Sequence, residues 1–273
     1  MWYTVSMIIP LFFILGLIIG SFLNVVVCRL KEAETLLGRS FCRSCKKQIR
    51  WYDNIPLLSF LFLQGRCRDC RERISWQYPL LELTTALCFA LVGAFFFVSD
   101  DRGTWIETAW LLGVVSLLLS IAVYDLVHME IPVSLLVISV LWTGLFLGID
   151  FFVQNSWQLL WWESRLAQGV LGGGIVALFF FSLVYASRET WMGWGDVWLG
   201  GIVGLVVGFH AVLFMLTLSF GLGAFLGLLL IALKKKGMKS QLPFAPYLVL
   251  GTLSTLFLPR LFPDSVIWLL LFY

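Results

Sequence analysis

The chain has 273 residues, of which 60% are hydrophobic and 13% are charged, against roughly 25% charged residues in an ordinary soluble domain. This composition excludes a soluble cytosolic enzyme. The net charge of +3 is too small to indicate a nucleic-acid partner. Several apolar runs reach the length of about 20 residues that a helix needs to cross a bilayer. The sequence therefore predicts an all-α polytopic membrane protein.

Eight apolar stretches are long enough to be transmembrane helices, and a further stretch at 261–273 is too short to cross alone. The predicted spans are 5–28, 79–99, 107–127, 131–153, 167–187, 192–209, 211–233 and 244–260. The first exceeds the apolar core of a signal peptide and no basic residue precedes it, so we expect it to be retained. We expect no internal repeat and no low-complexity linker.

The longest polar interval, at 29–78, contains 11 of the 19 Lys and Arg residues. The positive-inside rule places this interval in the cytoplasm. Alternating spans bring three more loops to that side, around His128, at 188–196 and at 234–239. The cytoplasmic side then carries 16 of the 19 basic residues. The three basic residues predicted on the outer side are Arg102, Arg165 and Arg260. Both chain ends are predicted on that side as well.

Four cysteines in the polar interval form two Cys-x-x-Cys pairs, separated by 21 residues. They are Cys42, Cys45, Cys67 and Cys70. This spacing is typical of a zinc ribbon, in which four thiolates hold one structural Zn²⁺ and stabilise a domain with few aliphatic residues. The alternative is two disulfides, which a reducing cytosol disfavours. Cys28 and Cys88 lie in predicted spans and are interpreted as small buried hydrophobic residues.

Two aspartates, Asp125 and Asp196, end or begin predicted spans on the cytoplasmic side. Carboxylates are expensive near the membrane interior, and two close together share a proton. One can then activate water while the other protonates a carbonyl oxygen, which is aspartyl protease chemistry. Gly193 and Gly195 lack a Cβ and would let a substrate backbone approach. Two alternatives remain open: Asp196 caps a helix, or Asp125 is an interfacial residue in water.

Other catalytic classes lack their motifs. His128 and Glu130 are not part of a His-Glu-x-x-His sequence, so a zinc metalloprotease is disfavoured. His210 is predicted on the outer side, with no Gly-x-Ser-x-Gly partner for a serine mechanism. Two non-protease hypotheses are kept. A transporter or channel would use the aspartates as a proton or ion relay at mid-membrane depth, and a scaffold would recruit a partner through its zinc domain.

Several motifs resemble those of the type IV prepilin peptidases, a family of bifunctional leader peptidase/N-methyltransferases and Gly-x-Gly-Asp intramembrane aspartyl proteases. The resemblance covers most of the chain. Its motifs are Gly-Ser-Phe-Leu-Asn-Val-Val at 20–26, the two cysteine pairs, Trp-Tyr-Asp-Asn-Ile-Pro at 51–56, Gly-Arg-Cys at 65–67, Tyr-Pro-Leu-Leu-Glu at 78–82, Asp125 with Pro132, Gly193-x-Gly195-Asp196, and Leu-Pro-Phe-Ala-Pro-Tyr at 242–247.

The resemblance implies a multi-pass enzyme of the bacterial plasma membrane that serves type IV pili or type II secretion. It would cut the basic leader of prepilins or pseudopilins after a glycine, on the cytoplasmic side. Asp125 and Asp196 would be catalytic, with Gly193 and Gly195 supporting the substrate. The new N-terminus would then be methylated from S-adenosylmethionine, an activity that the resemblance assigns to Gly65 and the four cysteines. No Rossmann-like glycine motif supports the methyltransferase independently.

The implied organisation has three parts: a first transmembrane helix at 1–28, a cytoplasmic four-cysteine and methyltransferase part at 29–78, and a membrane-embedded aspartyl peptidase at 79–273. Three positions depart from the family pattern. Trp198 stands in place of a common lysine, Val133 in place of an acidic or amide residue, and Ala245 in place of a glycine. These differences affect the expected shape of the loops that hold the substrate. A member that cleaves without methylating is a narrower alternative. Asn24 in the first span is expected to hydrogen-bond across helices or to contact substrate.

Overall fold

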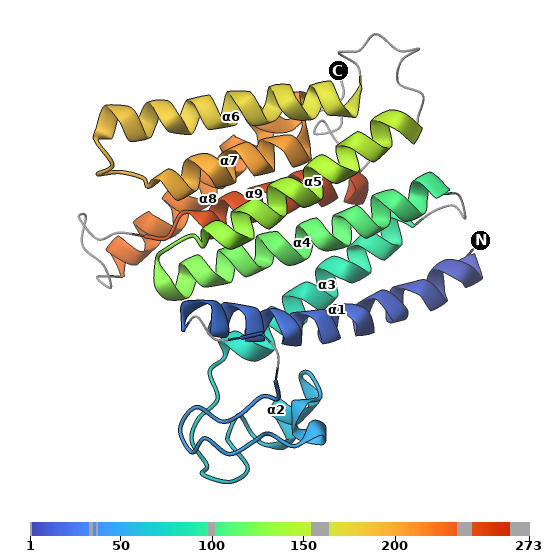
Figure 1. Ribbon diagram of the computed structural model, residues 1–273, viewed down its shortest axis with the longest axis vertical. Helices are drawn as coiled ribbons and strands as arrows, with labels where there is room; N and C mark the ends of the chain where they lie inside the picture. Colours follow the sequence, from blue (N-terminus) through green and yellow to red (C-terminus); the bar gives the residue numbers. More distant parts are fainter. Residues whose placement is uncertain are drawn as a thin grey trace. The chain divides into compact units, whose positions relative to one another are not determined.

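The computed structural model describes residues 2–32, 35–36, 38–97, 102–153, 164–233 and 242–262. These residues form helices, turns and two isolated β-bridges, with no strand among them. The elements are α1 (Trp2–Lys31), η1 (Trp51–Asn54), α2 (Leu58–Phe62), α3 (Gln77–Phe96), α4 (Arg102–His128), α5 (Val133–Val153), α6 (Arg165–Ser187), α7 (Trp194–Val207), η4 (Phe209–Ala211), α8 (Val212–Ala232) and α9 (Ala245–Leu261). The predicted all-α fold is confirmed (Figure 1).

Each predicted span coincides with a helix to within a few residues. Six stretches are apolar and long enough to cross a membrane, corresponding to α1, α3, α4, α5, α6 and α8. The spans predicted at 192–209 and 244–260 form the shorter helices α7 and α9, of 14 and 17 residues. At 1.5 Å per residue these helices are about 21 Å and about 25 Å long. Beyond Phe262, the last apolar stretch lies outside the described residues.

The chain divides into two compact units, Met1–Asp100 and Asp101–Tyr273. The first, called here the N-terminal unit, contains α1, α2, α3 and the cysteine pairs. The second, the C-terminal unit, contains helices α4 to α9 and both candidate aspartates. Each unit is therefore described by itself.

In the N-terminal unit, α1 packs closely against α3 because two glycines are spaced four residues apart on α1. A Cβ on Gly16 would lie 2.5 Å from the Cα of Ala86, and one on Gly20 would lie 2.7 Å from the Cα of Glu82. Small residues with this spacing let helix backbones approach in a membrane. Asn24 Nδ2 donates to the carbonyl oxygen of Tyr78 at 3.1 Å, so it does hydrogen-bond across the two helices.

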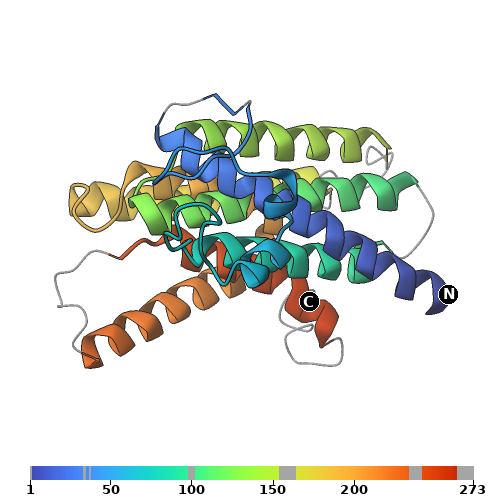
Figure 2. The ribbon, with the colours of Figure 1, turned by 90° about the horizontal axis from the view of Figure 1, so that it is seen from below.

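In the C-terminal unit, α7 packs against α5, α6 and α9 (Figure 2). Its side chains Leu199 and Ile202 belong to the fully buried core, together with Phe180 of α6, Met215 of α8 and Leu248 of α9. The position of α7 matters because its first turn carries Asp196.

The contact between α6 and α7 depends on glycines on both helices. A Cβ on Gly172 would lie 2.7 Å from the carbonyl oxygen of Gly204, and a Cβ on Gly204 would lie 2.6 Å from the carbonyl oxygen of Gly172. Real Cβ atoms do not approach backbone this closely, so any side chain at either position forces the helices apart. The two glycines therefore set the distance between α6 and α7.

We expect Gly172→Ala to destabilise the protein by about 1–3 kcal/mol, the usual cost of overpacking a core. The measurement is thermal unfolding in detergent. Gly174→Ala is the matched control, because a Cβ at Gly174 meets nothing within 4 Å. Equal melting temperatures for the two variants would contradict the close approach of α6 and α7.

Candidate active site and cysteine cluster

Asp125 lies in the last turn of α4, and its side chain is buried, with 6% of the residue exposed. Its Oδ2 atom accepts a hydrogen bond from the backbone N–H of Ala245 at 3.1 Å. Ala245 is the first residue of α9 and is itself fully buried. The start of α9 covers Asp125, so its burial disfavours the alternative of an interfacial residue in water.

Asp196 lies in the first turn of α7 and is half-buried. Its Oδ2 atom accepts a hydrogen bond from the backbone N–H of Gly193 at 3.3 Å, and its own N–H donates to the carbonyl oxygen of Gly193 at 3.1 Å. The helix cap considered for Asp196 is thus present. The cap engages one carboxylate oxygen, so capping does not exclude a chemical role for the other.

The C-terminal unit brings the two aspartates to the same end of its helices, because the start of α7 at Gly195 packs against Ile131, in the turn that follows α4. Both carboxylates are held by helix N-termini: Asp196 lies within the first turn of α7, and Asp125 accepts from the first residue of α9. Unpaired N–H groups and the helix dipole favour negative charge at these positions. This arrangement offsets part of the cost of bringing two carboxylates together inside an apolar bundle.

The two glycines before Asp196 occupy different environments. Gly193 is exposed, and a Cβ there would meet only the nitrogen of Gly195, at 4.0 Å. A Cβ on Gly195 would lie 3.0 Å from the Cβ of Ile131, in the turn that follows α4. Gly193 thus leaves room beside the backbone, whereas Gly195 lets the start of α7 pack against the segment that follows Asp125.

The three departures from the family pattern also separate by location. Val133 and Trp198 are exposed, at 71% and 63%, whereas Ala245 is fully buried and supplies the hydrogen bond to Asp125. Sequence reasoning did not assign this role to Ala245. The only signal was its place in the Leu-Pro-Phe-Ala-Pro-Tyr motif, because a backbone donor leaves no trace in the identity of a side chain.

The four clustered cysteines of the N-terminal unit have thiol sulfurs that all lie within 4.8 Å of one another. The Sγ atoms of Cys42 and Cys70 are 3.8 Å apart. Zn–S bonds of about 2.3 Å in a tetrahedron give S···S distances of about 3.8 Å, so the donor set fits zinc. All four are free thiols, and 3.8 Å between Cys42 and Cys70 exceeds the S–S bond length of about 2.05 Å.

The two cysteine pairs lie in turns with the same backbone hydrogen bonds. The N–H of Cys42 donates to Lys47 O at 2.9 Å, and the N–H of Cys67 donates to Glu72 O at 2.8 Å. One step outward, Ile49 N–H donates to Ser40 O and Ile74 N–H to Gly65 O. Residues 40–51 and 65–76 therefore repeat one structural unit with an offset of 25 residues, and the expectation of no internal repeat is wrong here.

Ionisation of the cysteine thiols is uneven. Loss of solvation opposes ionisation of Cys42, but hydrogen bonds from the backbone of Cys45 and Ser44 and from neighbouring thiols lower its pKa to about 7. A backbone hydrogen bond at Glu72 favours ionised Cys70, yet loss of solvation and the other thiols raise its pKa to about 12. The first thiolate therefore forms near neutral pH, whereas full ionisation needs a compensating cation.

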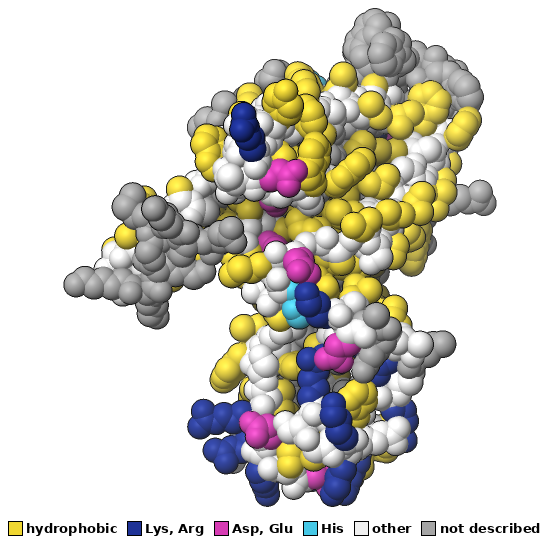
Figure 3. Space-filling view, turned by 60° about the vertical axis from the view of Figure 1, so that its left-hand side comes forward, with side chains coloured by type: hydrophobic (Ala, Val, Ile, Leu, Met, Phe, Trp, Pro, Cys, Tyr) yellow, Lys and Arg dark blue, Asp and Glu magenta, His cyan; other side chains and the backbone are white. Residues whose placement is uncertain are grey.

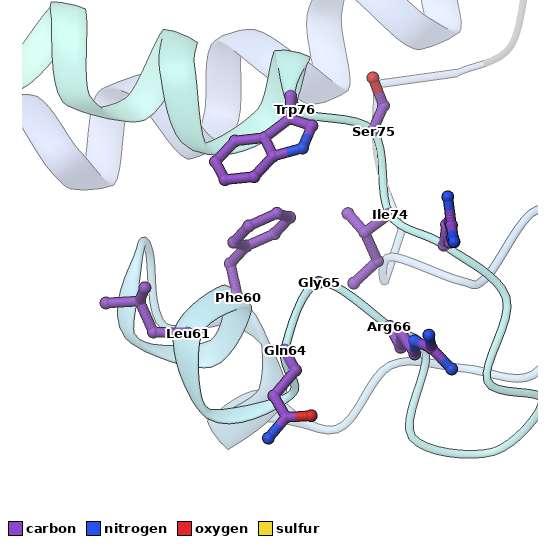
Figure 4. Close-up of a pocket in the computed structure, with 9 residues that line it drawn as sticks. Phe60, Leu61, Gln64, Gly65, Arg66, Ile74, Ser75 and Trp76 are labelled. Carbon is purple, nitrogen blue, oxygen red and sulfur yellow. The ribbon is translucent and has the colours of Figure 1, made fainter.

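An open pocket of about 840 Å³ lies beside the second cysteine turn (Figure 4). The rings of Phe60 and Trp76 both line it and contact each other, with centroids 5.1 Å apart and planes tilted by 59°. Arg66 and Arg73 line the same pocket. Gly65 also lines it, with a φ of +66° and a would-be Cβ 3.0 Å from the ring of Phe60, so a side chain there would be strained and would enter the pocket.

Fold and sites together define a polytopic helical membrane protein with a carboxylate pair at helix ends and a four-thiol domain. Comparison with known families supplies the affiliation. The Bacterial Peptidase A24 N-terminal domain matches residues 14–96, and the Type IV leader peptidase family matches residues 112–228. The chain belongs to the type IV leader peptidase family.

Relatives match along nearly the whole chain. A type 4 prepilin-like proteins leader peptide-processing enzyme of Escherichia coli O78:H11 is 37% identical, over 90% of this chain and 93% of the relative. A prepilin leader peptidase/N-methyltransferase of Bacillus subtilis is 30% identical, over 95% and 96%. The protein of that name from Pseudomonas aeruginosa is 31% identical, over 87% and 86%. No solved structure matches the chain.

We expect the purified protein to carry about one zinc ion per chain, measured by elemental analysis, and Cys42→Ser and Cys67→Ser to lose it. Cys88→Ser is the control, because Cys88 lies in α3 outside the cluster. Acid should release the metal, because protons compete with zinc for thiolates. A metal-free wild type, or zinc that survives the loss of Cys42, would contradict a four-thiolate site.

Proposed function

We propose that this protein is a membrane aspartyl endopeptidase that removes the leader peptide from prepilins or pseudopilins and then methylates the new N-terminus. The observation that carries the proposal is the pairing of buried Asp125 with Asp196 at two helix ends, in a member of the type IV leader peptidase family. Relatives carry the names of both activities.

Peptide cleavage by the pair requires one protonated and one ionised carboxyl group. The ionised group takes a proton from water as the water oxygen attacks the scissile carbonyl carbon, and the other group protonates the carbonyl oxygen. The C–N bond then breaks, its electron pair stays on the nitrogen, and a proton passes to the leaving amine. Because the two carboxyls exchange protons as a unit, either Asp125 or Asp196 can begin as the base.

The backbone around the pair sets its geometry. The N–H of Ala245 engages Oδ2 of Asp125, which leaves the other oxygen to exchange protons with water or substrate. Gly193 is exposed, so its backbone is uncovered beside Asp196. We assign to Gly193 the approach of the extended substrate and to Gly195 the close packing of the two aspartate-bearing segments.

The orientation proposed is that the aspartates and the cysteine domain face the cytoplasm of a bacterial plasma membrane. The support is the charge distribution, because 16 of 19 basic residues fall on that side when the spans alternate. A relay for ions or protons is less consistent with the structure, because Asp125 and Asp196 lie in terminal turns of their helices rather than at mid-length.

The methyltransferase half is proposed for the pocket beside Gly65. Its residues suit S-adenosylmethionine: the aromatic faces of Phe60 and Trp76 suit an adenine ring or a sulfonium cation, and Arg66 or Arg73 suits a carboxylate. When bound, this cofactor supplies an electrophilic methyl group. The chain's task is to hold the new amine, unprotonated, in line with that methyl group.

A structural zinc supports this pocket in the proposal. Cys67 and the pocket residues Gly65, Arg66, Arg73 and Ile74 belong to the same turn, closed by the bonds from Ile74 to Gly65 and from Cys67 to Glu72. A zinc ion bound by Cys67 and Cys70 would therefore fix the position of one wall of the pocket. The metal would act through the fold and not on the substrate.

We expect Asp125→Asn and Asp196→Asn to lower cleavage of a prepilin-like peptide by about 10²–10⁴-fold, the usual contribution of an acid or base. The substrate is a basic leader ending in Gly, followed by Phe and an apolar helix, and mass spectrometry reports the products. Asp150→Asn is the control, because Asp150 is a buried aspartate near the C-terminal end of α5, whereas the turn that follows Asp125 leads to the N-terminal end of α5. Normal cleavage by either dyad variant would refute the mechanism.

With S-adenosylmethionine present, we expect Trp76→Ala to cleave normally but to lose the methylated product. Trp51→Ala is the matched control, because Trp51 occupies the equivalent place in the first repeat and does not line the pocket. Methylation retained in Trp76→Ala, or lost equally in both variants, would contradict the assignment of this pocket.

A further inference from the structure

The segment η1–α2 exposes apolar side chains that the peptidase and methyltransferase sites leave unexplained. Leu58, Leu61 and Phe62 on α2 are 52%, 70% and 84% exposed. Their spacing of three and four residues puts them on one face of the helix. Trp51 and Ile55, just before α2, are 75% and 40% exposed. Figure 4 shows Leu61 directed away from Phe60 and Trp76, at the edge of the pocket that it helps to line, whereas Leu58 and Phe62 do not line the pocket.

The residue before α2 is attached to the side of α3, which in turn packs against α1. The N–H of Leu57 donates to Oε2 of Glu82 at 2.8 Å, and Glu82 also hydrogen-bonds with Ser21 of α1. Glu82 lies about 7.5 Å inside α3, and Ser21 lies about 15 Å before the end of α1, at 1.5 Å per residue. Both helices are apolar and of membrane-spanning length. Figures 1 and 2 likewise show α2 within the length of α1.

This attachment places α2 at the depth of a bilayer boundary. If α1 and α3 span the membrane, a helix fixed beside Ser21 and Glu82 lies closer to the bilayer centre than the C-terminal end of α1 and the N-terminal end of α3. Phe62 and Leu61 then face acyl chains, where their burial is favourable by the hydrophobic effect. Ser59 Oγ donates a hydrogen bond to the carbonyl oxygen of Tyr52 and accepts one from the N–H of Ile55, so η1 is joined to α2. Trp51, the first residue of η1, therefore lies beside α2, and tryptophan is typical of the membrane interface.

Charge around this segment selects the kind of lipid. Residues 38–78 carry nine basic and three acidic side chains, an excess of six positive charges. All nine basic residues are exposed. Figure 3 shows Lys and Arg side chains, in dark blue, gathered on the lower part of the face in view. A short apolar helix face beside clustered Lys and Arg is the pattern of interfacial helices on anionic membranes.

We propose that η1–α2 is an interfacial membrane anchor of the cysteine domain. Leu58, Leu61 and Phe62 enter the acyl-chain boundary, and the surrounding Lys and Arg residues bind anionic phospholipid headgroups. This anchor fixes the domain, with its pocket, against the bilayer surface. A new N-terminus at the head of an apolar pilin helix would emerge at that same surface. The lipid contact itself does not depend on the proposed enzymatic activities.

The test uses the full chain reconstituted in vesicles that contain phosphatidylglycerol, and photoactivatable lipids with the reactive group in the acyl chain. Mass spectrometry maps the adducts. We expect acyl-chain adducts on residues 58–62, none on 66–73 of the second cysteine turn, and weaker labelling when phosphatidylglycerol is replaced by phosphatidylcholine. Labelling that is insensitive to lipid charge would overturn the role of the basic residues.

A matched pair of variants separates insertion from general damage. Leu58→Asp with Phe62→Asp, which changes no residue that lines the pocket, should lose the acyl-chain adducts while keeping its metal content and melting temperature. Leu36→Asp changes a leucine of the same unit that is 45% exposed and lies outside η1–α2, and it should label like the wild type. Adducts from headgroup probes alone, or protection of α2 by a second protein chain instead of lipid, would refute insertion.

Discussion

The cost of placing two carboxylates inside an apolar helical bundle governs the C-terminal unit. Asp125 is buried at the C-terminal end of α4, and the C-terminal end of a helix dipole disfavours negative charge. The N-terminus of α9 meets it there, through the N–H of Ala245. The start of α7 does the same for Asp196 through Gly193. Two helices far apart in sequence therefore have to begin at this place.

The two helices that begin at the aspartates are also short. The two helices with N-termini at the aspartates have 14 and 17 residues, whereas α4, α5 and α6 have 27, 21 and 23. Close glycine packing between α6 and α7 then compensates in part, because backbone contact replaces the side-chain contacts that a short helix lacks.

The sequence was sufficient for the helices and for which side chains carry chemistry. Apolar runs identify the helix boundaries to within a few residues, and Cys-x-x-Cys pairs identify a thiolate cluster regardless of its exact geometry. It was insufficient where the backbone does the work. The donor at Ala245, the contact of Gly195 with Ile131, and the attachment of Leu57 to Glu82 involve peptide groups or close approaches that no side-chain pattern records.

The repeat within the cysteine domain was missed although the sequence carries it. Residues 40–51 and 65–76 share their cysteines, one arginine, one isoleucine and one tryptophan at an offset of 25 residues, but the unit is short and occurs twice, and its hydrogen bonds make the repeat plain. Each repeat ends in an exposed tryptophan that leads into different structure. Trp76 turns into α3 and lines the pocket, whereas Trp51 opens η1 and leads to α2. One cluster of four thiolates thus fixes two turns whose outgoing chains serve different purposes, and holding them together couples the pocket to the lipid-facing helix.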